Sequence, residues 1–194
     1  MESLTSRKLE FVCRKCGRVV SCEEYKLNHY CPNPDCKTLL NLCPLPKYWM
    51  FQFNPKIYRW FDRIRDTQEP EQWLTSQHSK YIHKGDLVAI WASGEKAAIN
   101  ALGQIITDPS KAQLKVDQVK YWIDKANISK FQENKSVLVK YLKIIKETPL
   151  LEDECQNNPT LLGLQVFINP QGTNFSLQYE QWQKITELIE KSNQ

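Results

Sequence analysis

Hydrophobic runs long enough to cross a membrane are absent from this sequence. The longest apolar stretches, Tyr48–Phe53 and Leu87–Trp91, are far shorter than the ~20 residues that a membrane helix needs. The first ten residues, MESLTSRKLE, also lack the apolar segment of a signal peptide. From these absences we expect a soluble, cytoplasmic protein with no membrane partner.

Residue patterns for common catalytic chemistry are scarce as well. The chain has only three histidines, His29, His78 and His83, and none has a metal-ligating partner four residues away. No G-x-S-x-G motif, P-loop or acidic cluster spaced for two metal ions is present, and the acidic run Glu152–Glu154 is interpreted as a solvated loop. We therefore predict that the chain is not an enzyme.

Charge is nearly balanced overall but uneven along the chain. The 26 Lys and Arg residues and 22 Asp and Glu residues give a net charge of +4. Between Lys111 and Lys146 there are nine lysines and three acids, whereas Glu147–Gln194 has seven acids and two lysines. The basic stretch is compatible with a phosphate backbone as partner. The alternative is a solvated face, because a lysine at every fifth residue from 115 to 140 aligns on neither a helix nor a strand face.

Cysteines are concentrated at one end, where six of the seven precede residue 44. Cys13-Arg-Lys-Cys16-Gly17 forms one tight turn, and Cys31-Pro-Asn-Pro-Asp-Cys36 follows after fourteen intervening residues. Two such turns are typical of a zinc ribbon, because each presents two thiolates to a tetrahedral Zn²⁺. Disulfides are the alternative, which a reducing cytosol disfavours. We predict a structural zinc bound by Cys13, Cys16, Cys31 and Cys36, with Cys22, His29 and Cys43 as substitute ligands.

The end of the cysteine-rich segment predicts a domain boundary. Pro44-Leu45-Pro46 has the composition of a stiff linker, and we expect a zinc ribbon over residues 1–46 and a larger domain over residues 47–194. In the larger domain we expect strands at 48–53, 87–91, 98–107 (half exposed), 136–145 and 164–169, and helices at 55–66 and from 178, with a short helix or loop at 150–161. Single helices between strands predict an α+β fold rather than a doubly wound sheet.

Six segments of the larger domain carry a family resemblance. They are YWMFQFNP (48–55), EQW (71–73), KGD (84–86), IWASG (90–94), NPQGTNF (169–175) and EQW (180–182). In this order they resemble the EVE domain of the PUA-like superfamily, including versions fused to modification-dependent restriction systems, over roughly residues 47 to 190. The resemblance implies a PUA-like β-barrel flanked by helices, with a pocket that takes a nucleobase, often methylated, out of its stack.

The resemblance also implies which side chains surround the base. Trp73 and Trp91 are the expected walls that sandwich it. The rim and the loop that faces the base edge are expected to be formed by Asn54, Ser76, Ser93 and Gly94, and by Gln171, Gly172, Thr173 and Asn174, respectively. The chemistry agrees, because a flipped base needs two π faces and polar groups at its edge. Trp49, Trp60 and Trp182 lie on apolar faces and are expected in the core.

The sequence thus predicts a reader that flips a modified, methylated base into an aromatic pocket. DNA is the favoured partner and RNA an alternative one. Such a reader would be the recognition component of a DNA defence or modification-sensing system, and any cutting would need a nuclease or other effector protein in trans. The alternatives are a PUA-like RNA-binding or modification-associated enzyme or accessory protein, and a module that binds only other proteins.

Overall fold

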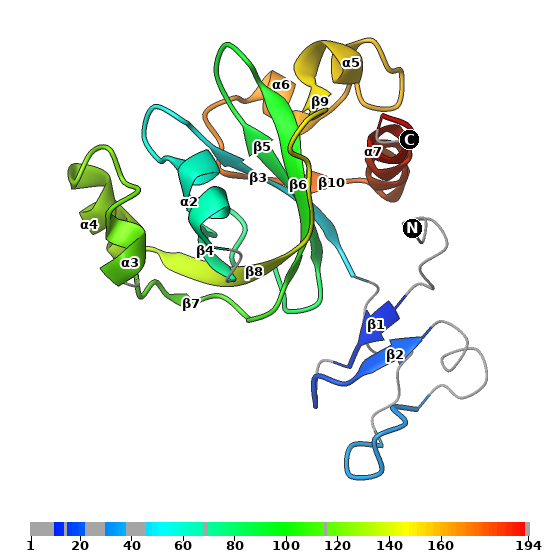
Figure 1. Ribbon diagram of the computed structural model, residues 1–194. Coiled ribbons are helices and arrows are strands. Elements are labelled where there is room, and N and C mark those ends of the chain that lie inside the picture. Colours follow the sequence, from blue (N-terminus) through cyan, green and yellow to red (C-terminus); the bar gives the residue numbers. More distant parts are fainter. Residues whose placement is uncertain are drawn as a thin grey trace.

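The structure is a computed structural model that describes residues 10–13, 15–21, 30–37, 46–67, 70–114 and 116–192. It contains a two-stranded sheet near the N-terminus and an eight-stranded sheet flanked by helices (Figure 1). Among the described residues, no helix has the length and apolar character needed to cross a membrane.

The small sheet is an antiparallel hairpin of β1 (Glu10–Val12) and β2 (Val19–Ser21). Between the two strands the chain turns through Cys13 and Cys16, and the Gly17 amide donates to the Cys13 carbonyl at 2.7 Å. Gly17 has a φ of +76°, in the left-handed region where a side chain would be strained. The predicted substitute zinc ligands Cys22, His29 and Cys43 lie outside the described residues.

The large sheet is mixed and curled. Its strand order is β10 (Asn174–Leu177), β3 (Tyr48–Phe53), β5 (Leu87–Ala92), β6 (Ala98–Ile105), β8 (Lys135–Ile144) and β4 (Glu71–Leu74), with β7 (Ser110–Lys111) on β8 and β9 (Leu150–Leu151) on β6. Only β3 and β5 run parallel. The outermost strands approach each other at one end, where the Asn174 side-chain amide donates to the Leu74 carbonyl at 2.7 Å. The curl therefore makes a half-barrel.

The helices lie on both faces and at one end of this sheet. They are α2 (Trp60–Asp66), α3 (Val116–Val119), α4 (Ala126–Glu133), α5 (Glu152–Gln156), α6 (Gln165–Ile168) and α7 (Tyr179–Lys191). In Figure 1, α5, α6 and α7 lie on one side of the sheet, α2 lies on the other, and α3 and α4 lie together near one end of β8. The arrangement fits the predicted α+β, PUA-like fold.

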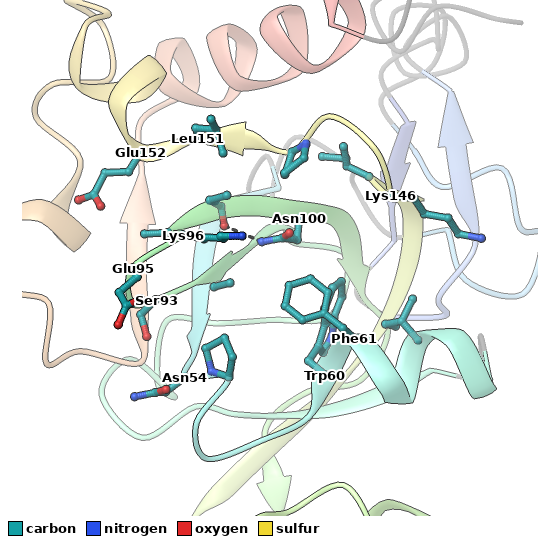
Figure 2. A pocket seen from close by; sticks show the side chains of 18 of the residues that line it. Asn54, Trp60, Phe61, Ser93, Glu95, Lys96, Asn100, Lys146, Leu151 and Glu152 are labelled. Atoms are coloured by element: carbon teal, nitrogen blue, oxygen red, sulfur yellow. Dashed lines mark hydrogen bonds between the residues drawn. The ribbon is translucent and has the colours of Figure 1, made fainter.

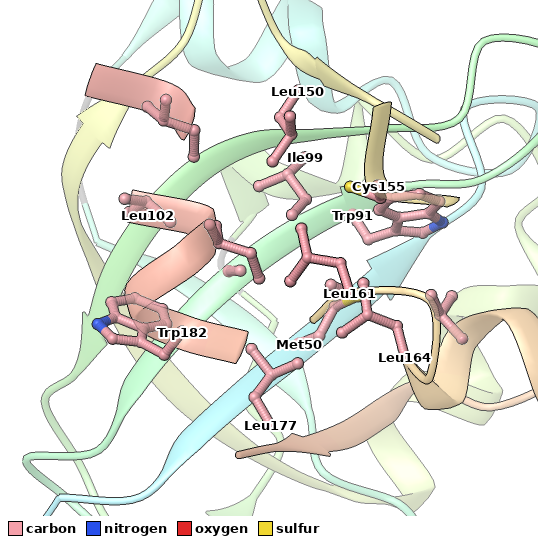
Figure 3. Close-up of a cluster of buried hydrophobic side chains, with 14 of the residues drawn as sticks. Met50, Trp91, Ile99, Leu102, Leu150, Cys155, Leu161, Leu164, Leu177 and Trp182 are labelled. Carbon is pink, nitrogen blue, oxygen red and sulfur yellow. The ribbon is translucent and has the colours of Figure 1, made fainter. Parts of the chain in front are cut away.

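Strand alternation divides the buried side chains between two cores. Trp49, Phe51 and Phe53 of β3 face the inside of the curl, whereas Met50 faces α5 and α7. The inner core consists of Trp49, Phe51, Phe53, Trp60, Ile64, Trp73, Ile82, Val88, Ile90, Ala92, Ala101, Ile105, Val137 and Val139. The outer core includes Met50, Trp91, Ile99, Leu102, Cys155, Leu161, Leu164, Trp182, Ile185 and Ile189 (Figure 3). The prediction that Trp49, Trp60 and Trp182 are core residues is confirmed.

Several elements differ from the sequence predictions. The segment 164–169 was expected as a strand, but residues Gln165–Ile168 form the one-turn helix α6. A short apolar run is compatible with a strand or with a buried helix, so the pattern did not decide between them. As a helix, the segment buries Leu164 and Val166 in the outer core. Strand β6 was expected to be half exposed, but only Gln104 of its residues is not fully buried, because both faces of the sheet are covered. Helix α2 begins at Trp60 rather than near residue 55, and β4 and β10 were not predicted.

Candidate functional site

A cavity of about 480 Å³ lies between the sheet edge and the helices α3 and α4. We call it the aromatic cavity. Its walls come from the end of β3, the turn 54–58, β4, the two helices and the loop 170–173. Its lining is Gln52, Phe53, Asn54, Ile57, Tyr58, Gln72, Trp73, Leu74, Ser76, Ser93, Leu114, Gln118, Trp122, Asn127, Lys130, Phe131, Asn134, Pro170, Gln171, Gly172 and Thr173. The volume is in the range of small-ligand sites.

Aromatic rings from three separate segments line this cavity. Tyr58 and Trp122 lie with ring centroids 5.0 Å apart, and Trp122 packs edge-on against Phe131 at 5.4 Å. Trp73 from β4 packs edge-on against Phe53 at 6.1 Å. The backbones of Tyr58 and Trp122 also form a β-bridge, which fixes the segment before α4 to the turn before α2. The cavity thus has ring faces from β4 and from the segment between α3 and α4.

A buried hydrogen-bond network holds Trp73 in place. The Trp73 indole donates to the Tyr141 hydroxyl at 3.1 Å, and Tyr141 in turn donates to the Glu71 carboxylate. Tyr58 donates to the other oxygen of Glu71, so this carboxylate links rings from two walls. Burial raises the pKa of Glu71, and burial together with the facing carboxylate raises the pKa of both phenols, so the phenols stay protonated donors.

The loop 170–173 is tied to the sheet at the cavity mouth. The side-chain amide nitrogen of Gln52 donates to the Pro170 carbonyl at 2.8 Å, and the hydroxyl oxygens of Ser76 and Thr173 are 2.8 Å apart. A Cβ at Gly172 would collide with the ring of Phe175, so only glycine lets the loop lie this close to β10. The loop therefore presents Gln171 and Thr173 from a fixed backbone.

Four polar side-chain atoms in the lining are buried without a hydrogen-bond partner. They are the amide oxygens of Gln52, Gln72 and Gln118 and the indole nitrogen of Trp122. An unpaired buried polar atom costs about 1–3 kcal/mol, so native proteins pair nearly all of them. These four atoms belong to the wall around one cavity but are closed off from its open space, so a ligand edge reaches them only when the side chains turn.

Seven of the ten base-pocket residues predicted from the sequence line the aromatic cavity. These are Asn54, Trp73, Ser76, Ser93, Gln171, Gly172 and Thr173. Asn174 does not line it, because this side chain is 1% exposed and is bonded to the Leu74 carbonyl as a strut between β10 and β4. Gly94 lines a different cavity, described below.

Trp91 does not form a wall of the aromatic cavity, contrary to the sequence prediction. Its side chain is 2% exposed and lies in the outer core, with its ring edge-on to Phe167 at 5.8 Å (Figure 3). The reason is strand alternation: in β5, Ile90 and Ala92 face the inner core, and Trp91 between them faces α5 and α6. Trp91 and Trp73 are therefore on opposite faces of the sheet.

The sequence reasoning missed Tyr58, Trp122 and Phe131 as ring-bearing walls. Trp122 and Phe131 fall within the basic stretch 111–146, where aromatic residues interleave with lysines. That interleaving was the available signal, because stacking faces next to cations suit a nucleic-acid surface. No sequence pattern marked Gln72 or Gln118 as residues that line the cavity.

A second cavity of about 1030 Å³ adjoins the aromatic cavity (Figure 2). It is bounded by α2, by the turn between β5 and β6, and by the segment 144–153. Asn54 and Ser93 line both cavities, and Gly94, with a φ of +108°, lines only the second. The second cavity also contains Trp60, Phe61, Lys96, Asn100, Lys146 and Glu152.

The four cysteines predicted as metal ligands lie together. Their sulfur atoms are all within 4.8 Å of one another, with Cys13 to Cys36 and Cys16 to Cys31 at 3.6 Å. A tetrahedron of Zn–S bonds of about 2.3 Å would place the sulfurs roughly 3.8 Å apart, so the donor set fits a metal ion. A hydrogen bond from the Arg18 backbone lowers the pKa of the Cys16 thiol to about 6.

The family model for the EVE domain matches residues 47–188. The chain belongs to the EVE domain family. No curated protein matches the sequence.

Solved structures share the fold of this EVE domain at low identity. A hypothetical protein from Leishmania major has a TM-score of 0.58 and 17% identity, with 77% of this chain and 98% of that chain covered. Rpa0253 from Rhodopseudomonas palustris has a TM-score of 0.56 and 14% identity, with 75% and 94% covered. Human THYN1, solved in complex with DNA containing 5-methylcytosine, has a TM-score of 0.55 and 11% identity, with 74% and 98% covered.

Proposed function

We propose that the EVE domain of this chain reads a modified base of nucleic acid by holding it in the aromatic cavity. The observation that carries the proposal is the combination of ring faces on two walls with three unpaired glutamine oxygens in the same lining. A base has two π faces and a polar edge, so it supplies a partner to both kinds of group.

Trp73 and Trp122 are the proposed stacking faces, with Trp122 replacing Trp91 in that role. Stacking on one aromatic side chain contributes roughly 1–3 kcal/mol and accepts any base. Burial of one methyl group adds only about 0.8 kcal/mol, which is about fourfold in affinity. Stacking and methyl burial alone therefore give a weak preference for a methylated base.

Selectivity comes from the amide groups in the wall. Gln72 and Gln118 can turn their terminal amides at little cost, because that torsion is broad, whereas the Gln52 amide is held by its bond to the Pro170 carbonyl. A base edge that matches them removes the penalty of the unpaired oxygens, and a mismatched base leaves it in place. Gln171 and Thr173 of the fixed loop, and Asn54 and Ser93 at the rim, complete the polar boundary.

Lysines beside the cavity are the proposed phosphate contacts. Lys130 lines the cavity, and Lys125 precedes α4 on the same segment. Both are exposed, and among the described residues neither has an ion-pair partner. Lys120, by contrast, forms an ion pair, with its Nζ 3.5 Å from an Asp66 carboxylate oxygen. Free cations that flank an aromatic slot are typical of single-strand and flipped-base recognition.

DNA is the proposed substrate class, supported by the complex of the structurally similar human THYN1 with DNA containing 5-methylcytosine. We further propose that recognition includes flipping of the base, that the chain itself is not an enzyme, and that it serves a cytoplasmic defence or modification-sensing system with an effector protein in trans. An RNA-binding role, alone or beside a modifying enzyme, is the second candidate.

The N-terminal part of the proposal is a zinc ribbon over residues 1–46, ahead of the EVE domain at 47–194. Four thiolates fill a tetrahedral site, so a zinc ion there would be structural and would stabilise a segment too short for a core of its own.

A binding comparison tests the proposed function. The full chain is titrated with paired oligonucleotides that differ only by 5-methylcytosine against cytosine, or by N6-methyladenine against adenine, in DNA and in RNA. We expect one modified oligonucleotide to bind more tightly than its unmodified twin, and Trp122→Ala to abolish the difference. Tyr81→Ala is the matched control, because Tyr81 is 58% exposed and lines neither cavity. Equal affinity for every pair across several salt concentrations would overturn the proposal.

A further inference from the structure

The second cavity contains an exposed ring that packing does not explain. Phe61 on α2 is 50% exposed, although the helix buries Trp60 and Ile64 on either side of it in sequence. The Phe61 ring packs edge-on against Trp60 at 5.3 Å and against Phe53 at 5.8 Å, so neighbouring rings hold it from behind. Its remaining face is open to the cavity, which suits a flat ring as a stacking partner.

Cations with no ion-pair partner lie in the same cavity. Lys96 and Lys146 line it, and in the part of the chain that the structure describes neither forms an ion pair. Lys56 and Arg65 also line the cavity, but each forms an ion pair, Lys56 with Glu95 and Arg65 with Asp62. The carboxylates of the lining are Glu95, Glu152 and Asp153, and Figure 2 shows Glu95 and Glu152 at one side of the cavity and Lys146 at the other. Lys96 lies on the same side as Glu95, at the turn between β5 and β6, so the two cations are on opposite sides of the cavity (Figure 2).

The two cavities meet at one residue pair. Ser93 is fixed at the end of β5, because its hydroxyl donates to the Phe53 carbonyl at 3.1 Å. The Asn54 side-chain oxygen accepts from the Lys56 backbone amide at 2.8 Å, and the residues that the structure describes supply no partner for its side-chain NH2 group. Phe53, whose ring packs against Phe61, also lines the aromatic cavity. Phe53 thus connects the aromatic cavity to the Phe61 ring, and Asn54 and Ser93 lie where the two cavities meet.

We propose that the second cavity binds the nucleotide next to the one held in the aromatic cavity. Its base stacks on Phe61, and Lys96 and Lys146, from opposite sides of the cavity, pair with the phosphates that flank this nucleotide. Asn54 lies between the two nucleotides and donates from its free amide. This inference rests on the proposed function, and it extends the site from a single base to a dinucleotide.

The test compares ligands of increasing length on the full chain. The modified nucleoside, the dinucleotide that contains it and a longer single strand are titrated against wild type, Phe61→Ala and Phe61→Leu. Stacking predicts that Phe61→Ala weakens dinucleotide binding by roughly tenfold and leaves nucleoside binding unchanged. Phe61→Leu keeps the packing against Trp60 and Phe53 but removes the π face, and it is expected to weaken the dinucleotide in the same way. Tyr81→Ala is again the control without effect.

The lysines are tested through salt dependence. The double variant Lys96→Gln, Lys146→Gln is expected to lower the slope of log affinity against log salt for the longer single strand by about 0.7 per lost phosphate contact. Equal affinity of nucleoside and dinucleotide, or Phe61 variants that leave the dinucleotide unaffected, would overturn the inference while the proposed function stands. Absence of nucleoside binding together with loss of all modification preference would instead remove the proposed function.

Discussion

Gln118 shows the cost of the proposed site at the scale of one residue. Its side chain is 1% exposed, and its amide oxygen has no hydrogen-bond partner in the wall of the aromatic cavity. Such an atom destabilises the folded state. We propose that it is kept because the bound base pairs with it. Stability and binding are therefore opposed at this position.

Gln118→Leu is expected to raise the free energy of unfolding by about 1 kcal/mol, because the unpaired oxygen is removed from a buried site. The same change is expected to reduce the preference for the modified base. Urea unfolding measures the first effect and oligonucleotide titration the second. A less stable variant that keeps the full preference would show that Gln118 is an ordinary wall residue.

Single residues also mark how far the sequence reasoning reached. Trp73 and the loop Gln171–Thr173 could be placed from their motifs, because those motifs sit where β4 ends and where the chain enters β10. Trp91 could not be placed, since one step of strand register decides between the two faces of the sheet. Trp122 was missed because its position depends on a β-bridge to Tyr58, 64 residues away in a segment without a motif.

At the scale of elements, the Glu71 network joins β4, β8 and the turn before α2. Glu71 accepts from Tyr58 and Tyr141, and Tyr141 accepts from the indoles of Trp60 and Trp73 at 2.9 and 3.1 Å. Trp60 of the second cavity and Trp73 of the aromatic cavity are thus held by the same phenol, and that phenol and Tyr58 by one carboxylate. Burial raises the pKa of Glu71 above its ordinary value of 4.5.

A raised pKa gives the pH dependence a definite sign. The folded protein retains the Glu71 proton at pH values where the unfolded chain has lost it, so this contribution to stability is complete below about pH 4.5 and decreases as pH rises through the folded pKa. The glutamine in Glu71→Gln cannot ionise. The free energy of unfolding of this variant is therefore expected to fall less between low and high pH than that of wild type. Urea unfolding of wild type and variant at pH 4.5 and pH 8 measures it. Parallel pH profiles for the two proteins would contradict the assignment.

Elements with strong periodicity or long apolar runs could be predicted, and short ones could not. The strands at 48–53 and 87–92 and the helix at 179–191 follow from patterns that tertiary contacts reinforce. Helix α6 has four residues, and β4 and β10 have four each, which is too few for a period to be read. Strands β4 and β10 form only by pairing at the two edges of the sheet, and α6 is set by the burial of Val166 in the outer core.

At the scale of the whole molecule, the cysteine cluster and the EVE domain are separate parts of one chain. Cysteine spacing alone predicted which four cysteines the structure brings together, since each pair is local and only the two turns must meet. Elemental analysis is expected to find one zinc per chain, and Cys13→Ser is expected to lose it, because three thiolates leave the tetrahedron incomplete. Full zinc content in Cys13→Ser, or none in wild type, would rule out this site.

The proposed reading of a modified base requires that a base enters the aromatic cavity. A crystal structure of the full chain with the tightest-binding modified oligonucleotide tests this most directly. We predict the modified ring between Trp73 and Trp122, with its polar edge bonded to at least one of Gln52, Gln72 and Gln118. A base that stays stacked in its strand, or a strand bound elsewhere on the molecule while the cavity is untouched, would contradict it.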